Sequence, residues 1–542
     1  AACGFFIFME EDMAEIIIDN ITFFYETPYK MIFQDLNLRI DTMWKTGLIG
    51  RNGRGKTTLL NIIQKKSDVQ KGRIINNIDC VYFPYQNFNP DADTFSVIKN
   101  AVAPYELMEK EMEELLSKND EKSILRYMEV LNGYQAAGGY EIDSEILKEA
   151  QSIGIGAEIL NRPFCTLSGG EKTRSLLISV FLKKGSYALI DEPTNHLDMK
   201  GREILGEYLK SKSGFLMISH DRYFLDLCVD HIITINKSQV EVMQGNYSDW
   251  EYNFTNRLKM EEKQNEKLTR EIRSLQGASS LYRQVSGSKE KEKYKGSQSD
   301  TSMIDRGFVG AKSAKLAKQA VNFEKRISRN IEQKKELLTD TEKLYELKLL
   351  KEEKSPSAVL DIYDLSLKLG EKEILKNFSL SVKKGERIAI TGRNGCGKTS
   401  LFNCITGEID NYSGEIFFPK YIRIMRSYQV PRWQQGYLKD NILRTGVDET
   451  VFRNVMGILG VSGDIFLKPL QEFSEGERKK IDLCRTLIEP SSLLLWDEPL
   501  NYLDIASREL LEQTILKFEP TILFIEHDRY FIENVAQRVI AF

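Results

Sequence analysis

The sequence predicts an α/β protein with two copies of one domain in tandem, joined by a long α-helical hairpin, with a helical arm inserted in the first copy. Three observations predict this arrangement. A set of short motifs occurs twice in the 542 residues, the stretch between the two sets has no strand pattern, and the first set is spread over more residues than the second. Recurrence of a whole motif set indicates a duplicated domain.

The repeat consists of three motifs in the same order. GRNGRGKTT at 50–58 recurs as GRNGCGKTS at 392–400, IDEPTNHLD at 190–198 as WDEPLNYLD at 496–504, and SHDRYF at 219–224 as EHDRYF at 526–531. The two glycine-rich motifs are 342 residues apart and the two acidic motifs 306 apart, so copy one holds 36 more residues between them.

The extra residues of copy one predict the arm. Residues 105–131 have apolar side chains at helical spacing among many Glu and Lys. Between the copies, 258–275 and 316–350 are predicted as two long polar helices, and the segment 277–310, rich in Gly, Ser and Lys, as the loop that joins them. The predicted domains are 14–248 with the arm at about 100–140, a hairpin linker at 249–355 with its tip at about 277–310, and 356–542.

The composition excludes several classes of protein. The net charge of −4 gives no general basicity that would indicate a nucleic-acid partner. The seven cysteines are scattered and form no CxxC pair, which argues against a zinc site or a disulfide framework and favours the reducing cytoplasm. No apolar run approaches the roughly 18–20 residues of a membrane span.

The repeated GxxxxGK[ST] motif is a phosphate-binding loop. Its glycines let backbone N–H groups converge on phosphates, and the helix that follows favours an anion at its N-terminus. Lys56 is expected to neutralise the phosphate oxygens, and Thr57 to offer a hydroxyl to Mg²⁺. The predicted phosphate-loop residues are Gly50, Asn52, Gly53, Gly55, Lys56, Thr57 and Thr58 in copy one, and Gly392, Asn394, Gly395, Gly397, Lys398, Thr399 and Ser400 in copy two.

Each acidic motif follows an apolar strand. The first carboxylate, Asp191 or Asp497, is expected to hold Mg²⁺ through water, and the second, Glu192 or Glu498, to polarise the attacking water. An isolated Asp-Glu pair is usually surface charge. At this distance from a phosphate loop and directly after a strand, the pair indicates catalysis.

Three further groups of residues accompany these motifs. LSGGE in copy one is a Gly-rich turn that opens a helix, with Ser168, Gly169 and Gly170; copy two has the altered turn Ser474-Glu475-Gly476. His220 and His527 each follow an apolar strand and are expected to sense a terminal phosphate. Gln86 and Gln429 also follow strands and are expected to reach Mg²⁺ or water.

The complete set resembles the ATP-binding-cassette ATPases over both copies. The resemblance implies two P-loop cassettes that bind ATP and Mg²⁺ and pair head to tail within a monomer. Site one would then combine the loop and catalytic residues of copy one with Ser474 and Gly476, and site two those of copy two with Ser168 and Gly170. Tyr25 matches the aromatic residue that stacks on adenine in that family, whereas copy two has Leu369 at the matching place.

Within the cassette proteins, the chain is similar to the ABC-F class. DEPTNHLD at 191–198 and QGNYSDW at 244–250 carry this likeness, and WKTGLIGRNGRGKTTLL, VYFPYQ, RPFCTLSGGEKT, WDEPLNYLD and residues 293–315 resemble its Lsa-like antibiotic-resistance branch. The resemblance implies a cytoplasmic ATPase that binds ribosomal RNA and tRNA at the exit-tRNA site of the ribosome, with no membrane subunit. It also implies displacement of lincosamides, pleuromutilins and streptogramin A.

The linker independently favours an RNA partner. Residues 267–335 hold 17 Lys and Arg against 7 Asp and Glu, and phosphate contacts by basic side chains supply much of nucleic-acid affinity. Lys293, Met303, Ile304 and Phe308 are the predicted ribosome-contacting residues of the tip. The alternative from charge alone is a solvated hairpin whose apolar residues pack between its helices.

Two other functions stay open at this level. The inserted arm is usual in housekeeping ABC-F translation factors, which have no drug role, and it therefore favours that function. An energy subunit of a transporter also uses paired cassettes, but the basic spacer between the copies does not point to one.

Overall fold

The computed structural model describes residues 15–26, 29–85, 88–118, 120–236, 240–295, 325–326, 347, 349, 357–370, 372–461 and 463–542, with the backbone alone at 278, 279, 281–295, 369 and 372. Two compact units divide the chain. One combines residues 1–248 and 345–542, and the other is 249–344. No helix within the described ranges combines the length and the apolar character that a membrane crossing needs.

The first cassette is built on a mostly parallel sheet. Its described strands are ordered β5-β6-β7-β3-β8-β9, and only β8 and β9 pair antiparallel. The inner strands are continuous apolar runs because both faces of such a sheet are covered. The bounds are β3 Lys45–Gly50, β5 Asp79–Phe83, β6 Ser186–Asp191, β7 Phe215–Ile218, β8 His231–Ile235 and β9 Val240–Gln244.

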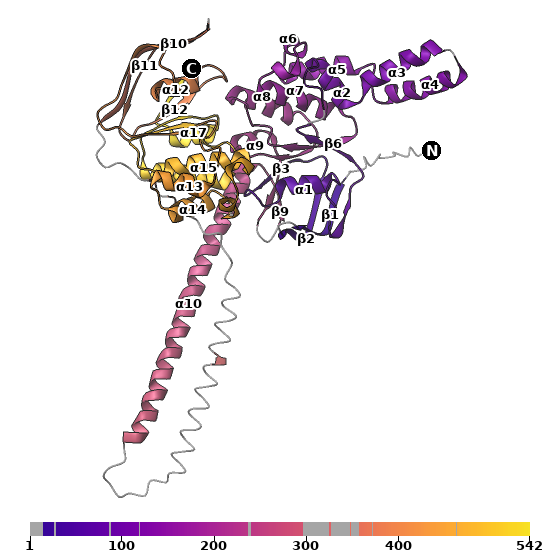
Figure 1. The fold of residues 1–542 in the computed structure, drawn as a ribbon. Coiled ribbons are helices and arrows are strands. Elements are labelled where there is room, and N and C mark those ends of the chain that lie inside the picture. Colours follow the sequence, from indigo (N-terminus) through magenta and orange to yellow (C-terminus); the bar gives the residue numbers. More distant parts are fainter. Residues whose placement is uncertain are drawn as a thin grey trace, which may run out of the picture. The chain divides into compact units, whose positions relative to one another are not determined.

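A second, antiparallel sheet of the first cassette packs with the parallel one around α1 (Lys56–Ile63) (Figure 1). Its described strands are β2 (Tyr29–Asp41), β1 (Glu15–Glu26) and β4 (Lys71–Ile75), in that order. Leu59 and Leu60 of α1 are fully buried in the core that both sheets share. The remaining helices of this cassette are α2 Thr94–Val102, α5 Ile142–Ser152, α6 Ala157–Leu160, α7 Gly169–Leu182, α8 Met199–Lys210 and α9 Arg222–Cys228.

The second cassette repeats this plan. Its described parallel strands are ordered β14-β15-β16-β12-β17, and its antiparallel strands β11-β10-β13. The bounds of the strands are β10 Ala358–Leu369, β11 Lys372–Lys383, β12 Arg387–Thr391, β13 Ser413–Phe417, β14 Ile424–Ser427, β15 Leu493–Asp497, β16 Ile522–Ile525 and β17 Arg538–Ala541. The helices are α12 Lys398–Ile405, α13 Leu438–Thr445, α14 Glu449–Ile458, α15 Glu475–Ile488, α16 Ile505–Phe518 and α17 Arg529–Val535.

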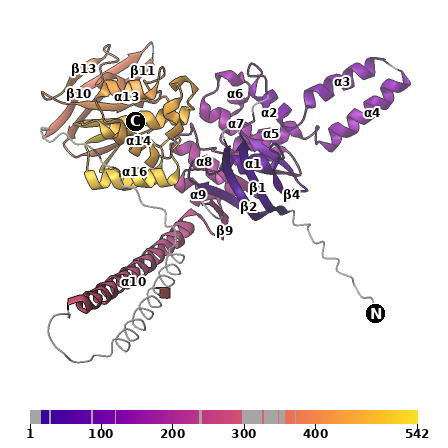
Figure 2. The same cartoon turned by 60° about the horizontal axis from the view of Figure 1, so that its bottom comes forward.

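The extra residues of the first cassette form two helices. These are α3 (Tyr105–Lys118) and α4 (Glu121–Ala136), which pack against each other beyond α2 (Figure 2). Tyr105 anchors the pair at its base, where its buried hydroxyl donates to the carbonyl of Ala137 at 2.6 Å. The rest of the pair is held by few buried side chains and carries its charges on the surface.

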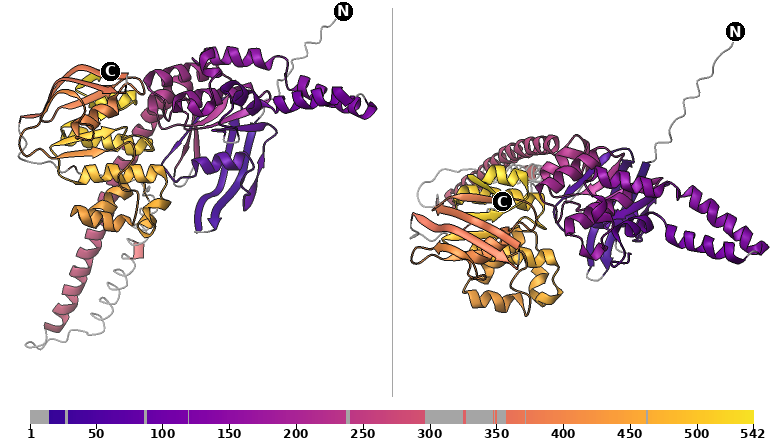
Figure 3. Two further views of the ribbon diagram at one scale, coloured as in Figure 1. Left: turned by 45° about the horizontal axis from the view of Figure 1, so that its top comes forward. Right: turned by 90° about the horizontal axis from the view of Figure 1, so that it is seen from above.

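Helix α10 (Tyr247–Lys295) is longer than the sequence predicts (Figure 3). Residues 277–295, expected to belong to a loop, are helical, so the predicted tip at 277–310 is wrong over that part. The lysines and glutamates of this stretch are good helix formers, and their preference outweighs the cost of about 1 kcal/mol at Gly277. Lys293 therefore lies in α10, with its side chain outside the described residues, as Met303, Ile304 and Phe308 are entirely.

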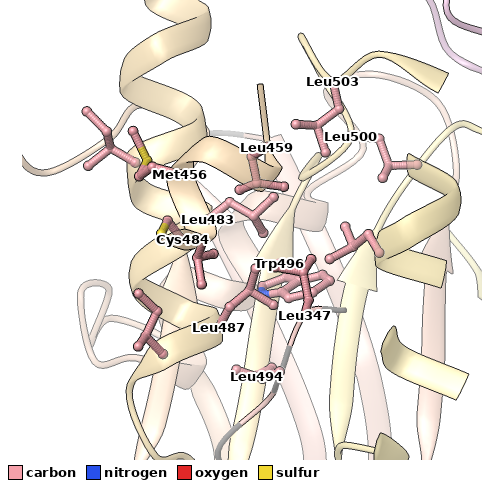
Figure 4. Close-up of a cluster of buried hydrophobic side chains, with 14 of the residues drawn as sticks. Leu347, Met456, Leu459, Leu483, Cys484, Leu487, Leu494, Trp496, Leu500 and Leu503 are labelled. Atoms are coloured by element: carbon pink, nitrogen blue, oxygen red, sulfur yellow. The ribbon is translucent and has the colours of Figure 1, made fainter. Parts of the chain in front are cut away.

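Two residues at the expected C-terminal end of the second linker helix differ from the prediction. Leu347 and Leu349, placed by the sequence within a helix over 316–350, are not helical. Both are buried in the core of the second cassette, where Leu347 lies beside Trp496 (Figure 4).

Candidate functional site

The two phosphate loops close around their own lysines. Lys56 is buried, and its Nζ donates to the carbonyl of Gly50 at 2.6 Å. Lys398 donates to the carbonyls of Gly392 at 2.8 Å and Arg393 at 2.9 Å. Each loop therefore curls around the ammonium group of its own lysine. The phosphates of a bound nucleotide would contact the ammonium group at that position.

A glycine immediately before each lysine makes this curl possible. Gly55 caps α1 with a φ of 92°, and a Cβ there would lie 2.4 Å from the side chain of Ile32. Gly397 caps α12 with a φ of 106° and would meet Ile374 at 2.2 Å. Both the left-handed backbone and the close approach require glycine, which explains this position of the motif physically.

The carboxylate and hydroxyl expected to hold Mg²⁺ meet in copy one. The Thr57 hydroxyl donates to Asp191 Oδ2 at 3.1 Å, and the Tyr82 hydroxyl donates to the same oxygen at 2.9 Å. Burial raises the pKa of Asp191, and the two hydroxyls and Lys56 oppose that rise. An oxygen-only set of this kind suits Mg²⁺.

In copy two, the matching carboxylate lies beside cations. Asp497 is buried, and its Oδ2 is 3.9 Å from Nη2 of Arg426. Burial and the neighbouring Glu498 raise the pKa of Asp497, while Lys479, Thr399 and Arg426 oppose the rise. Neither carboxylate oxygen of Asp497 makes a hydrogen bond to the residues that the structure describes, so the bond between Thr57 and Asp191 is not repeated in copy two.

Both predicted catalytic glutamates have the same unusual backbone. Glu192 and Glu498 each have a φ of 50°, a left-handed conformation that non-glycine residues adopt mainly at functional sites. Their amides donate to the carbonyls of Ile218 at 2.9 Å and Ile525 at 3.0 Å. These bonds tie each glutamate to the strand end that precedes its histidine.

Each glutamate faces a buried histidine. His220 Nε2 is 3.4 Å from Glu192 Oε1, and His527 Nε2 is 4.0 Å from Glu498 Oε1. Burial, with the charge of Lys56, lowers the pKa of His220 well below its usual value, and burial lowers that of His527 to about 3. Both imidazoles are therefore neutral at physiological pH and can donate one hydrogen bond to a phosphate.

The carboxylate of Glu192 is available to bind water. Burial, reinforced by Asp191, raises its pKa to about 7. Its Oε1 makes no hydrogen bond to any residue that the structure describes. A buried acceptor without a donor fits a position where a water molecule would bind.

The Gly-rich turns are both well-capped helix starts. Ser168 caps α7 and Ser474 caps α15, and each forms a capping box with the glutamate three residues later. In copy two, Glu475 replaces a glycine of the turn, and its carboxylate accepts from the hydroxyl of Tyr502 at 3.0 Å. The substitution therefore keeps the helix start but adds a negative charge to it.

The cassettes touch through their nucleotide motifs. The amide of Asn52 donates to Asp504 Oδ2 at 2.7 Å, and its side chain donates to the carbonyl of Tyr502 at 3.0 Å. In the equivalent contact, Asn394 donates to the carbonyl of His196 at 2.9 Å. Each phosphate loop thus contacts the C-terminal part of the acidic motif of the other copy.

The remaining predicted residues lie around these groups. Tyr25 is half exposed on β1, and its hydroxyl is 3.1 Å from that of Thr58. Gln429 is exposed just after β14. Gln86 lies outside the described residues, as does the side chain of Leu369, the counterpart of Tyr25.

Comparison with known proteins identifies these domains. The ABC transporter family model matches residues 33–195 and 375–501, more than half of the chain, and each matched range holds a phosphate loop and an acidic motif. The chain belongs to the ABC transporter family. Its two tandem cassettes are ATP-binding domains of that family.

Two relatives extend over nearly the whole chain. ABC transporter F family member 5 of Arabidopsis thaliana is 27% identical over 532 residues, which cover 94% of this chain and 72% of that protein. The ribosome protection protein VmlR of Bacillus subtilis (strain 168) is 26% identical over 539 residues, which cover 96% and 86%. These relatives support a place in the F group of the ABC family.

A solved structure has the same fold. A chain in the complex of the archaeal ribosomal stalk protein aP1 and the archaeal ribosome recycling factor aABCE1 has a TM-score of 0.60 and 17% identity, covering 96% of this chain and 87% of that one. At this identity the likeness concerns the fold alone.

Sequence reasoning missed several charged residues near the ABC motifs. Arg222 and Glu512, from different cassettes, form a buried ion pair. Arg202 pairs with Asp221 at 2.6 Å and also donates to the carbonyl of His527, in the other cassette, at 3.1 Å. The repeated DRYF could have drawn attention to Arg222, but its partner lies 290 residues away and outside any repeated motif.

Proposed function

We propose that the chain is an ABC-F ATPase that binds the ribosome at the exit-tRNA site and displaces antibiotics from the peptidyl-transferase region. Lincosamides, pleuromutilins and streptogramin A are the expected drugs. The observation that carries the proposal is the likeness to a ribosome protection protein over 96% of this chain. The proposal sets the protein in the cytoplasm, where ribosomes work.

ATP binding is the first part of the proposed cycle. Lys56 and Lys398 would neutralise phosphates, and Thr57 with Asp191, and Thr399 with Asp497, would hold Mg²⁺. The contact of Asn52 with Asp504 supports the pairing of each phosphate loop with the other cassette. A nucleotide bound there would stabilise the closed pair, because its phosphates add contacts to both cassettes.

Hydrolysis would end the closed state. Glu192 and Glu498 are suited to orient the attacking water, and the neutral histidines beside them can donate to the terminal phosphate. Loss of that phosphate removes the charge that binds the Gly-rich turn of the opposite cassette, so the pair opens and the ribosome is released.

The linker would provide the contact with RNA. Residues 267–335 carry 17 basic and 7 acidic side chains, which favours binding to phosphates in a salt-dependent manner. Helix α10, with 49 residues, extends roughly 70 Å at the rise of an α-helix. A helix of this length could carry the predicted tip residues Met303, Ile304 and Phe308 to a site deep within a large partner.

Inhibitory concentrations in a susceptible bacterial host test the drug role. Expression of the chain should raise them for at least one of the three drug classes, and the Lys56→Ala/Lys398→Ala variant should not. If expression of the intact chain leaves all three unchanged, the drug role is wrong.

A housekeeping translation factor is the second candidate, and the arm formed by α3 and α4 favours it. Under this alternative the chain still binds ribosomes when ATP is bound and not cleaved, but expression of the chain does not change drug susceptibility. The effect of the intact chain on drug susceptibility distinguishes the two. If it raises an inhibitory concentration, resistance should survive deletion of residues 105–136, because the proposal assigns drug displacement to the linker and not to the arm.

A further inference from the structure

The second cassette has a buried lysine where the first has a hydroxyl residue. Counting from the serine that caps each helix, Lys479 of α15 corresponds to Thr173 of α7. The side chain of Lys479 is buried, and its Nζ donates to the carbonyls of Tyr428 at 2.7 Å and Asp497 at 2.8 Å. Lys479 therefore connects two segments of the site. One segment leads to Gln429, and the other carries the acidic motif.

A buried glutamate replaces a second hydroxyl residue of the first cassette. Glu526 precedes His527 and corresponds to Ser219, which precedes His220. Its Oε1 accepts from the amide of Leu500 at 2.8 Å, and its Oε2 accepts from the amide of His527 at 3.0 Å. It therefore joins the segment just after Glu498 to the histidine loop.

Ser219 does not make the equivalent contacts. Its hydroxyl accepts from the amide of Asp221 at 3.2 Å, within its own loop. Thr173 is also too short to span two loops. The difference between the cassettes is thus a replacement of two short hydroxyl side chains by two long ones of opposite charge.

We propose that Lys479 and Glu526 are paired positioning residues of the second ATP site. Both bind the backbone of residues 497–500, one on each side of Glu498, and each extends that link to another loop of the same site. Together they fix Tyr428, Asp497, Leu500 and His527 relative to one another. The inference rests on the proposed ATPase function and names residues that act through the catalytic groups rather than on substrate.

The charge of each residue is compensated by groups around it. A buried charge that loses its partner is strongly destabilising, whereas a compensated set is tolerated. Burial lowers the pKa of Lys479, and Asp497, Asp482, Glu498 and Glu526 oppose that effect. Burial raises the pKa of Glu526 to about 7, and the two amides and Arg508 oppose it.

Another side chain of α15 strengthens the link. Asp482 Oδ2 accepts from the amide of Tyr428 at 2.7 Å, so α15 binds both the N–H and the C=O of that residue. The corresponding position of α7 is Leu176, which is apolar and buried. In the second cassette, charged groups of α15 therefore bind both backbone polar groups of Tyr428, in the loop before Gln429.

Single-turnover hydrolysis tests the proposal with each site isolated. In a Glu192→Gln background the first round of ATP cleavage reports site two, and in a Glu498→Gln background it reports site one. Lys479→Thr and Glu526→Ser restore the residues of copy one. Each should slow cleavage at site two by about tenfold or more, because small misplacements of reacting groups are costly, and leave site one within about twofold.

The double variant Lys479→Thr/Glu526→Ser tests whether the two residues form a pair. We expect its slowing at site two to be smaller than the product of the two single effects, because both residues act through the same backbone segment, 497–500, and effects within one network do not multiply. The proposal would be overturned if the two single effects multiply in the double variant. It would also be overturned if ATP cleavage slows equally at both sites or does not slow at site two. If Lys479→Thr does not fold, Lys479→Met keeps the apolar stem and takes its place.

Amide hydrogen exchange separates this inference from the proposed ATPase function. If the unaltered chain cleaves no ATP, the proposed function fails, but the positioning can still be measured. Glu526→Ser should then speed exchange at Leu500 and His527, whose amides bind Glu526, and Ser219→Ala should not. Unchanged exchange at both amides would overturn the inference.

Discussion

The two ATP sites share their motifs but differ in what surrounds the catalytic carboxylate. In site one, Glu192 lies 3.4 Å from its histidine, and its Oε1 makes no hydrogen bond to the described residues. In site two, Glu498 lies 4.0 Å from its histidine, and its Oε2 accepts from the side chain of Asn501 at 2.8 Å. Matching motifs therefore do not make equivalent sites, because the contacts of the two glutamates differ even within the acidic motif.

The largest expected effect comes from removing each catalytic carboxylate. Glu192→Gln and Glu498→Gln should each lower cleavage at their own site by about 10²–10⁴-fold, the usual contribution of a general base. Site-resolved single-turnover hydrolysis measures it. Nucleotide binding serves as the control, since both variants should still bind ATP. Loss of cleavage at both sites from either variant would mean that the sites do not act separately.

The arginines of the repeated DRYF motif offer a second contrast. Arg222 forms a buried ion pair with Glu512, whereas Arg529, at the same place in copy two, is 44% exposed and 3.8 Å from Glu203. Arg222→Met should lower the free energy of unfolding by about 3–5 kcal/mol, because Glu512 is left buried and unpaired. Arg529→Met should lower it by less than about 1 kcal/mol.

Urea unfolding followed by intrinsic fluorescence measures both values. The double variant Arg222→Met/Glu512→Met is the control, and it should recover much of the loss by replacing the pair with apolar groups. Equal destabilisation by Arg222→Met and Arg529→Met would contradict the contrast.

A smaller difference between the sites is expected from Tyr25, which should stack on adenine in site one. Tyr25→Ala should raise the KM of site one for ATP by about tenfold, because stacking on a base contributes about 1–3 kcal/mol, and leave its cleavage rate unchanged. Tyr25→Phe is the matched control, since it keeps the ring and loses only the contact with Thr58. A normal KM for Tyr25→Ala would show that the ring does not bind adenine.

The pH dependence of site one follows from Glu192. Burial and Asp191 raise its pKa to about 7, so the ionised form that attracts a proton from water is lost as the pH falls. In the Glu498→Gln background, cleavage at pH 6 should be about tenfold below its plateau above pH 8. ATP binding measured at the same pH values is the control, and a flat profile would be inconsistent with this role.

The smallest effect should come from the altered Gly-rich turn. Glu475 adds a negative charge at the start of α15, where the helix would otherwise favour an anion. Glu475→Gly should therefore tighten ATP binding at site one by about two- to fivefold, as expected for one charge near a helix end. Glu475→Gln is the control for shape, and weaker binding in Glu475→Gly would reverse the argument.

The sequence was sufficient for the parts of this molecule that depend on local chemistry. The phosphate loops and the acidic motifs follow from residue types at fixed spacing, as at Gly55 and Lys56. The C-terminal extent of α10 did not, because Gly277 and the neighbouring serines resemble a loop although the lysines and glutamates after them favour a helix. Contacts such as Arg222 with Glu512 depend on how distant segments pack.

Other features were in the sequence but had no motif to mark them. Lys479 and Glu526 become visible only when the two copies are compared position by position and the structure then shows what the long side chains reach. Leu347 and Leu349 flank the polar Lys348, but only their burial in the second cassette separates them from the linker.

Co-sedimentation with ribosomes tests the central claim most directly. The Glu192→Gln/Glu498→Gln variant binds ATP but cannot cleave it, so it should sediment with ribosomes when ATP is present and be released by high salt. The Lys56→Ala/Lys398→Ala variant should remain in the supernatant. If the variant that retains ATP also stays in the supernatant, binding to the ribosome is not the function of this protein.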